Sequence, residues 1–76
     1  MKLVAIEMFE GDCSTFYYMS SKNTLFWSVF PSSKKYPSSF RSVKKLKSFH
    51  SLNLIFDESE LTRLYNRYLM QEELLK

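Results

Sequence analysis

The chain has 76 residues, so we expect one small domain, residues 1–76. With one glycine, two prolines and 17% aromatic residues, the composition argues against long disordered segments. The net charge of +3 hides an uneven distribution, because residues 21–50 hold seven lysines and arginines and no acid, whereas every acid lies in residues 1–20 or 51–76.

Features for export or membrane insertion are missing from the sequence. The single cysteine, Cys13, cannot form an intramolecular disulfide, and small secreted domains usually depend on several. No apolar run approaches the roughly 20 residues of a membrane span. The apolar start of the chain is interrupted by Glu7 and has no small-residue cleavage site, so it does not resemble a signal peptide. We therefore expect a cytoplasmic protein with no membrane partner.

The first thirty residues have the composition of β-strands. Three segments are rich in β-branched and aromatic residues: Leu3–Phe9, Cys13–Met19 and Thr24–Phe30. The connections between them are short and turn-like, and the first contains the only glycine, Gly11. The sequence therefore predicts a three-stranded antiparallel meander.

Both faces of this sheet are apolar in places. Strict alternation puts Val4 and Ile6 on one face of the first strand and Leu3 on the other. If helices cover only one face, aromatic side chains such as Tyr17 and Trp27 stay partly exposed and mark a binding surface. If one helix packs on each face, or if the chain dimerises, these side chains are covered. The sequence does not decide between these arrangements.

The basic centre of the chain predicts an amphipathic helix within Pro37–Phe49, with Ser38 or Ser39 as its N-cap. The apolar side of this helix consists of residues three apart: Phe40, Val43 and Leu46. The opposite side carries Arg41, Lys44 and Lys45, with Lys47 at the boundary. Lys34 and Lys35 precede it in a polar loop, Pro31–Pro37.

A second helix is predicted from Asp57 onward. Asp57 and Glu60 have the spacing of a capping box, and Phe56 and Leu61 that of a hydrophobic staple. One stripe should pack on the sheet: Leu61, Leu64, Tyr65, Tyr68 and Leu75. Another side carries Arg63, Arg67, Met70 and Leu74. These last two apolar residues are either ordinary surface residues or a contact for a partner.

Together these patterns predict an α+β fold, in which a three-stranded antiparallel sheet is packed by two helices. The short apolar run Leu52–Phe56, between the helices, is compatible with a fourth, edge strand. Periodicity alone does not decide this point.

Residues for catalysis or metal binding are scarce. His50 is the only histidine and has no acid nearby in the sequence to orient it. Cys13 and His50 fall short of the four ligands of a structural zinc site. A glycine-rich phosphate loop needs more than one glycine. The sequence therefore predicts neither an enzyme nor a bound metal or cofactor.

Two functional hypotheses follow. The first is a protein-binding module that inhibits or regulates a larger protein or nucleoprotein complex, a role that suits a small protein encoded by a virus or mobile element. The second is nucleic-acid binding through the basic block 34–47 with aromatic residues to stack on bases. A homodimer is compatible with either. The candidate binding residues are Tyr17, Trp27, Lys34, Lys35, Arg41, Lys44, Lys45, Lys47, Arg63, Arg67, Met70 and Leu74.

Overall fold

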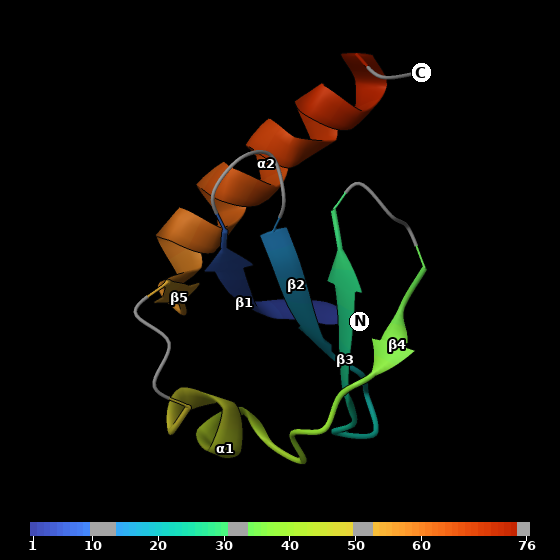
Figure 1. The fold of residues 1–76 in the computed structure, drawn as a ribbon, viewed down its shortest axis with the longest axis vertical. Helices are drawn as coiled ribbons and strands as arrows, with labels where there is room; N and C mark the ends of the chain where they lie inside the picture. Colours follow the sequence, from blue (N-terminus) through green and yellow to red (C-terminus); the bar gives the residue numbers. More distant parts are fainter. Residues whose placement is uncertain (10–13, 31–33, 50–52, 75–76) are drawn as a thin grey trace.

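The computed structural model describes residues 1–9, 14–30, 34–49 and 53–74, and the statements below concern these residues. They form a small α+β domain in which one antiparallel sheet carries two helices, α1 (Val43–Lys47) and α2 (Glu58–Leu74) (Figure 1). The strands are β1 (Lys2–Met8), β2 (Ser14–Met19), β3 (Leu25–Val29), β4 (Tyr36–Pro37) and β5 (Leu54–Ile55).

The predicted α+β class and antiparallel sheet are confirmed, but the sheet has five strands, in the order β4-β3-β2-β1-β5, instead of three with a possible fourth at the edge. The predicted meander is present in β1, β2 and β3, and the turn Ser20–Asn23 joins the last two. Asn23 has a φ of 59°, a left-handed conformation that asparagine tolerates well. The turn predicted around Gly11 lies outside the described residues.

The two added strands are short edge strands. β4 lies in the predicted loop, where Tyr36 pairs with Trp27 and Pro37 with Phe26. Proline has no N–H for a second neighbour, so an edge position suits it. β5 lies in the run that the sequence left open, and its Ile55 pairs with Ile6 of β1.

The predicted strict alternation of side chains along β1 was wrong, because the strand contains a β-bulge. The register with β2 shifts between Leu3 and Ala5, so Val4 is an extra residue in the ladder. As a result, Leu3 packs with Ile6 on one face of the sheet, and Val4 packs with Ala5 on the other. The sequence had placed Val4 with Ile6.

Helix α1 is shorter than the predicted helix and begins later. Its N-cap is Ser42, whose Oγ accepts a hydrogen bond from the Lys45 N–H at 3.1 Å. The prediction of Ser38 or Ser39 as the cap was wrong, because the helix begins only at Val43. The Ser38 N–H donates to the Leu25 carbonyl at 3.2 Å, and the Ser38 Oγ accepts the Phe40 N–H at 3.0 Å outside any helix. Arg41 therefore lies before the helix and not within it.

Helix α2 begins as predicted. The Asp57 carboxylate accepts a hydrogen bond from the Glu60 N–H at 3.1 Å, and the first turn is acidic, which suits the helix dipole. Leu61, Leu64 and Tyr68 are buried against the sheet, whereas Leu75 lies outside the described residues.

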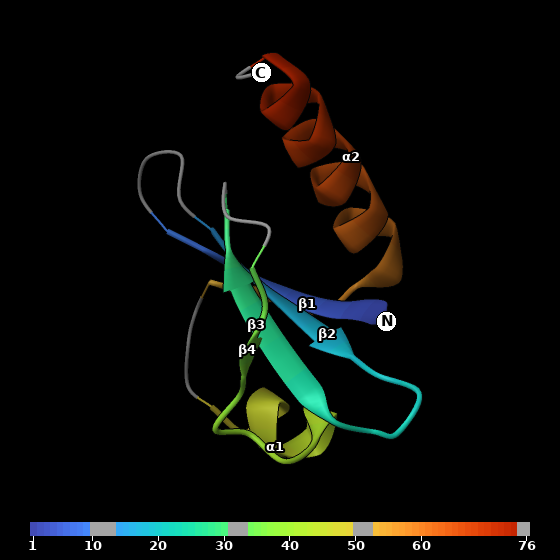
Figure 2. The ribbon, with the colours of Figure 1, turned by 90° about the vertical axis from the view of Figure 1, so that its right-hand side faces the viewer.

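The sheet separates two apolar layers, with one helix on each face (Figure 2). We call the side of α2 the α2 layer; its buried residues are Ile6, Phe16, Tyr18, Phe30, Leu61, Leu64 and Tyr68. We call the other side the α1 layer; its buried residues are Ala5, Tyr17, Leu25 and Leu46. Of the arrangements that the sequence left open, the chain has the one with a helix on each face.

Candidate binding surfaces

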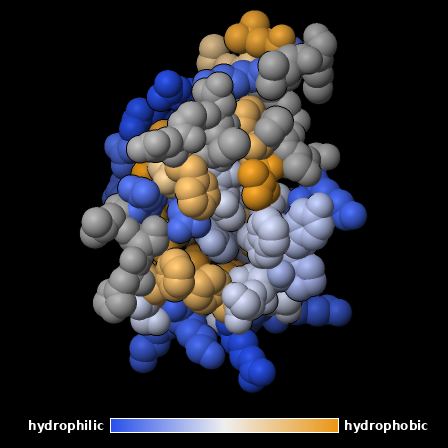
Figure 3. Space-filling model, in the orientation of Figure 1, coloured by the Kyte–Doolittle hydropathy of each residue, from blue (hydrophilic) through white to orange (hydrophobic). Residues whose placement is uncertain are grey.

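Helix α1 presents a cluster of cations at one end of the molecule, which we call the basic end and define as Arg41, Lys44 and Lys45. Leu46 is completely buried in the α1 layer and fixes the orientation of the helix, so Lys44 and Lys45 project into solvent. None of the three cations lies within ion-pair distance of a carboxylate in the described part of the chain. Hydrophilic side chains project from this end of the molecule (Figure 3).

The basic end is small. Five helical residues extend only about 7.5 Å along the helix axis. The turn between β2 and β3, which carries the exposed Lys22, lies at the same end of the molecule (Figures 1 and 2). Lys22 was not predicted as a site residue, since only the fold brings this turn towards α1.

A second surface lies at the β4 edge. The Trp27 ring is half-buried and stacks on the ring of Tyr36 with centroids 4.9 Å apart. Its Nε1–H donates to the Pro37 carbonyl at 2.9 Å. Lys34 and Lys35 are exposed here, with their Nζ atoms 5.4 Å and 4.6 Å from the ring centroids of Tyr36 and Tyr18. The aromatic rings at this edge are therefore already engaged with neighbours.

The third surface is the outer stripe of α2, which consists of Arg63, Arg67, Met70 and Leu74. Met70 is 68% exposed and Leu74 is 84% exposed. They lie at the end of the helix that extends beyond the sheet (Figure 1). The sequence missed Leu69, which is 41% exposed beside them and lies between the packing face and the stripe.

The two arginines of this stripe differ. Arg63 donates to the Glu60 carboxylate at 2.6 Å, which is the one ion pair found among the described residues. Arg67 is exposed one turn further on and has no such partner in the same part of the chain. Within the described part of the chain, the stripe therefore joins a guanidinium that has no ion pair to exposed apolar side chains.

Tyr17 was expected to be partly exposed if helices cover only one face of the sheet, and with a helix on each face it is buried. Tyr17 is only 9% exposed and packs edge-on against Phe40, with ring centroids 6.3 Å apart. Burial raises the pKa of Tyr17 to about 12, and the charge of Glu7 and its hydrogen bond to the Tyr17 hydroxyl act in the same direction. Tyr17 is therefore a core residue.

The predicted site residues thus fall on separate surfaces. The basic end and the exposed tip of α2 lie at opposite ends of the long axis, along which the domain measures 34 Å (Figure 1). Lys47 belongs to neither, because its Nζ lies 5.4 Å from the Phe56 ring centroid in a groove beside β1. A partner that contacts both ends must be large.

The part of the chain that the structure describes shows no group of three or more residues that could hold a metal ion. Cys13 and His50 lie outside it. Neither described helix is long and apolar enough to span a membrane. Comparisons with models of known protein families, with curated proteins and with solved structures found no match.

Proposed function

We propose that this protein is a small non-catalytic protein-binding module, which inhibits or regulates a larger protein or nucleoprotein complex by docking on it. The observation that carries the proposal is the outer stripe of α2. Methionine and arginine are enriched at the cores of protein interfaces, and exposed apolar side chains gathered at one place often mark such sites. Here Met70 and Leu74 are exposed near the end of α2 that extends beyond the sheet.

Charge complementarity specifies the partner surface. Among the described residues, Arg67 of this stripe has no ion-pair partner, and Met70 and Leu74 are exposed. The complement of the stripe is an apolar groove on a folded protein with a carboxylate at its rim. An amphipathic helix that lays a stripe into such a groove is a common mode of recognition.

The basic end contributes to association rather than to the contact itself. Exposed charges outside the core of an interface mainly change the association rate, and salt weakens their effect. Arg41, Lys44 and Lys45 have no described acid nearby, so their field is available to attract an acidic partner.

Nucleic-acid binding through the block 34–47 remains the second candidate, and the unpaired cations of the basic end favour it. Two observations weaken it. Trp27 and Tyr36 stack on each other rather than lying free to stack on bases, and Tyr17 is buried. Helix α1 has only five residues, which gives a major groove little to read.

The test first uses the wild-type protein to capture its partner from a lysate of the native host. The affinity of two double variants of the stripe for the captured protein is then measured. Met70→Asp with Leu74→Asp should weaken binding by about tenfold or more, as expected at the core of an interface. Met70→Leu with Leu74→Met keeps the stripe apolar and serves as the matched control. Both variants should melt like the wild type, because these side chains are exposed. Wild-type affinity of the first variant would refute the proposal.

Charge reversal of the basic end tests the second part of the proposal. Lys44→Glu with Lys45→Glu should slow association, and the effect should shrink as salt rises, because the Debye length is about 8 Å at 0.15 M salt. Dissociation should change little. If the captured partner is a nucleic acid, affinity should instead fall by about 0.7–0.9 log units per log unit of salt for each phosphate neutralised. That result would favour the second candidate.

A further inference from the structure

The N-terminal half of β1 is a sheet edge that the chain covers only in part. β5 pairs with β1 at Ile6 and Glu7, and the Met8 N–H donates to the Asn53 carbonyl at 3.1 Å. Lys2–Ala5 pairs with β2 alone. The backbone groups of Lys2–Ala5 that point away from β2 therefore have no strand partner among the described residues. Such an edge is a template for a further strand.

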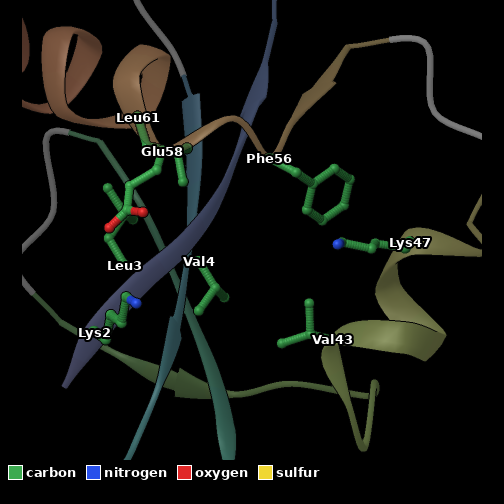
Figure 4. A pocket seen from close by; sticks show the side chains of 8 residues that line it. All are labelled: Lys2, Leu3, Val4, Val43, Lys47, Phe56, Glu58 and Leu61. Atoms are coloured by element: carbon green, nitrogen blue, oxygen red, sulfur yellow. The ribbon is translucent and has the colours of Figure 1, made fainter.

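A groove with a volume of 180 Å³ lies over this edge, between the start of α2 and helix α1 (Figure 4). The bulge in β1 puts Leu3 on the α2 side of the sheet and Val4 on the α1 side. Leu3 lies on the side of Leu61, and Val4 faces Val43 of α1 (Figure 4). The groove thus combines unpaired backbone with apolar side chains on both sides, which is what an added strand requires.

The charged groups at the groove favour an acidic occupant. Lys47 is exposed, and its Nζ lies 5.4 Å from the Phe56 ring centroid (Figure 4). Lys2, at the other end of the groove, is also exposed. Glu58 is the one acid among the residues that line this groove, so its lining carries two positive charges and one negative charge.

We propose that this groove binds an extended peptide segment that adds to the edge of β1 as a strand, with an aliphatic side chain between aspartate or glutamate residues. Unpaired backbone and apolar walls favour a peptide over a nucleic acid. A second copy fits less well, because a two-fold contact sets this groove, with its two lysines and one glutamate, against an identical groove of the same net charge. The inference goes beyond the proposed function, since it does not depend on the outer stripe of α2.

The probe is the synthetic peptide acetyl-Glu-Val-Ile-Val-Glu-amide, and the readout is NMR-detected hydrogen exchange of the backbone amides of the full chain. At roughly millimolar peptide, the outward-pointing amides within Lys2–Ala5 should exchange at least about tenfold more slowly. The control peptide carries proline in place of isoleucine. Because proline lacks an N–H and interrupts the ladder, it should give no such protection.

Charge variants separate strand addition from general attraction. Lys47→Glu should weaken binding of the first peptide by about twofold to fivefold, as expected for an exposed charge at a binding groove. The matched control is Lys22→Glu, in the turn between β2 and β3, and it should bind like the wild type. Met70→Asp with Leu74→Asp should also bind normally, so failure of the proposed function would be distinguishable from failure of this inference.

Several results would overturn the inference. Equal protection by the two peptides, or none by either, would mean that no strand is added. Protection of Lys2–Ala5 that rises with protein concentration in the absence of peptide would show that a second copy covers the edge. Protection by a short single-stranded oligonucleotide but not by the peptide would assign the groove to nucleic acid.

Discussion

The two layers of the domain are built differently. In the α2 layer a 17-residue helix packs on the sheet, and the Phe16 ring lies within 6.5 Å of the rings of Tyr18, Phe30, Tyr65 and Tyr68. In the α1 layer a five-residue helix contributes one fully buried side chain, Leu46. Many of the apolar residues around it are only partly buried, and a hollow of 330 Å³ lies beside Tyr17, Trp27 and Phe40.

This difference in packing suggests a different role for each layer: the α2 layer stabilises the domain, and the α1 layer can adjust its packing. Dense aromatic packing makes the α2 layer the main source of stability, because each large aromatic ring buries roughly 150–250 Å². A hydrogen bond between the Tyr68 and Ser14 hydroxyls also ties α2 to β2 across 54 residues of sequence. The α1 layer is held by fewer buried side chains and borders the groove at β1, so it has more freedom to adjust to an added strand.

The largest expected effect is a loss in the free energy of unfolding when a buried leucine is replaced by alanine. The test makes this substitution once in each layer. Leu64→Ala and Leu46→Ala each remove a side chain that is at most 4% exposed, and such changes cost about 2–5 kcal/mol. The cost depends on how far the surroundings relax. We therefore expect Leu64→Ala near the upper end of that range and Leu46→Ala near the lower end. Urea unfolding of both variants measures the difference. Equal costs would mean that the α1 layer is as tightly constrained as the α2 layer.

The α2 layer was the easier of the two to predict from sequence. Its helix is long and periodic, and the helical phase that buries Leu64 and Tyr68 also exposes Met70 and Leu74. A cap at Asp57 is a local signal, since the donor lies three residues away. The outer stripe of α2 could therefore be predicted from the sequence.

The α1 layer depends on contacts that are distant in sequence. The Ser38 N–H donates to the Leu25 carbonyl beside the sheet, and the helix begins only at Val43, later than the local pattern favours. Tyr17 is covered by Phe40, which packs against it from the connection between β4 and α1. The groove at β1 needs both the bulge at Val4 and a β5 that pairs with only part of β1, and neither has a clear local signal.

The second prediction concerns pH and uses the tyrosine that lines the hollow of the α1 layer. The pKa of Tyr17 is raised to about 12 in the folded protein, above its ordinary value of 10.0. Below pH 10 the phenol is neutral in both states and stability is unaffected. Between about pH 10 and pH 12 the unfolded chain loses this proton first, so stability falls as pH rises.

Tyr17→Phe removes this titration but keeps the ring in the α1 layer. Urea unfolding between pH 9 and pH 12 should show the wild type losing up to roughly 2 kcal/mol more than the variant over this range. Other tyrosines and lysines titrate in both proteins, so only the difference reports on Tyr17. Parallel pH profiles would show that the hollow beside Tyr17 admits enough water to hydrate the phenolate.

The smallest expected effects come from removing the N-cap of each helix. The two N-caps have the same hydrogen-bond geometry. The Asp57 carboxylate and the Ser42 hydroxyl each accept a backbone N–H three residues on, both at 3.1 Å. Replacing such a cap with alanine costs about 0.5–2 kcal/mol. Asp57→Ala should show this loss in the melting temperature, because α2 is part of the layer that stabilises the whole domain.

Ser42→Ala should lower the melting temperature less, because α1 can fray without opening the α2 layer. Its effect should appear instead as faster hydrogen exchange of the amides in Val43–Lys47, with little change in the amides of α2. Each variant is the other's control, since the same hydrogen bond is lost in both. An equal fall in melting temperature would show that α1 and α2 unfold together. In that case the two layers form one cooperative unit, and the α1 layer does not have the independent freedom that we assign to it.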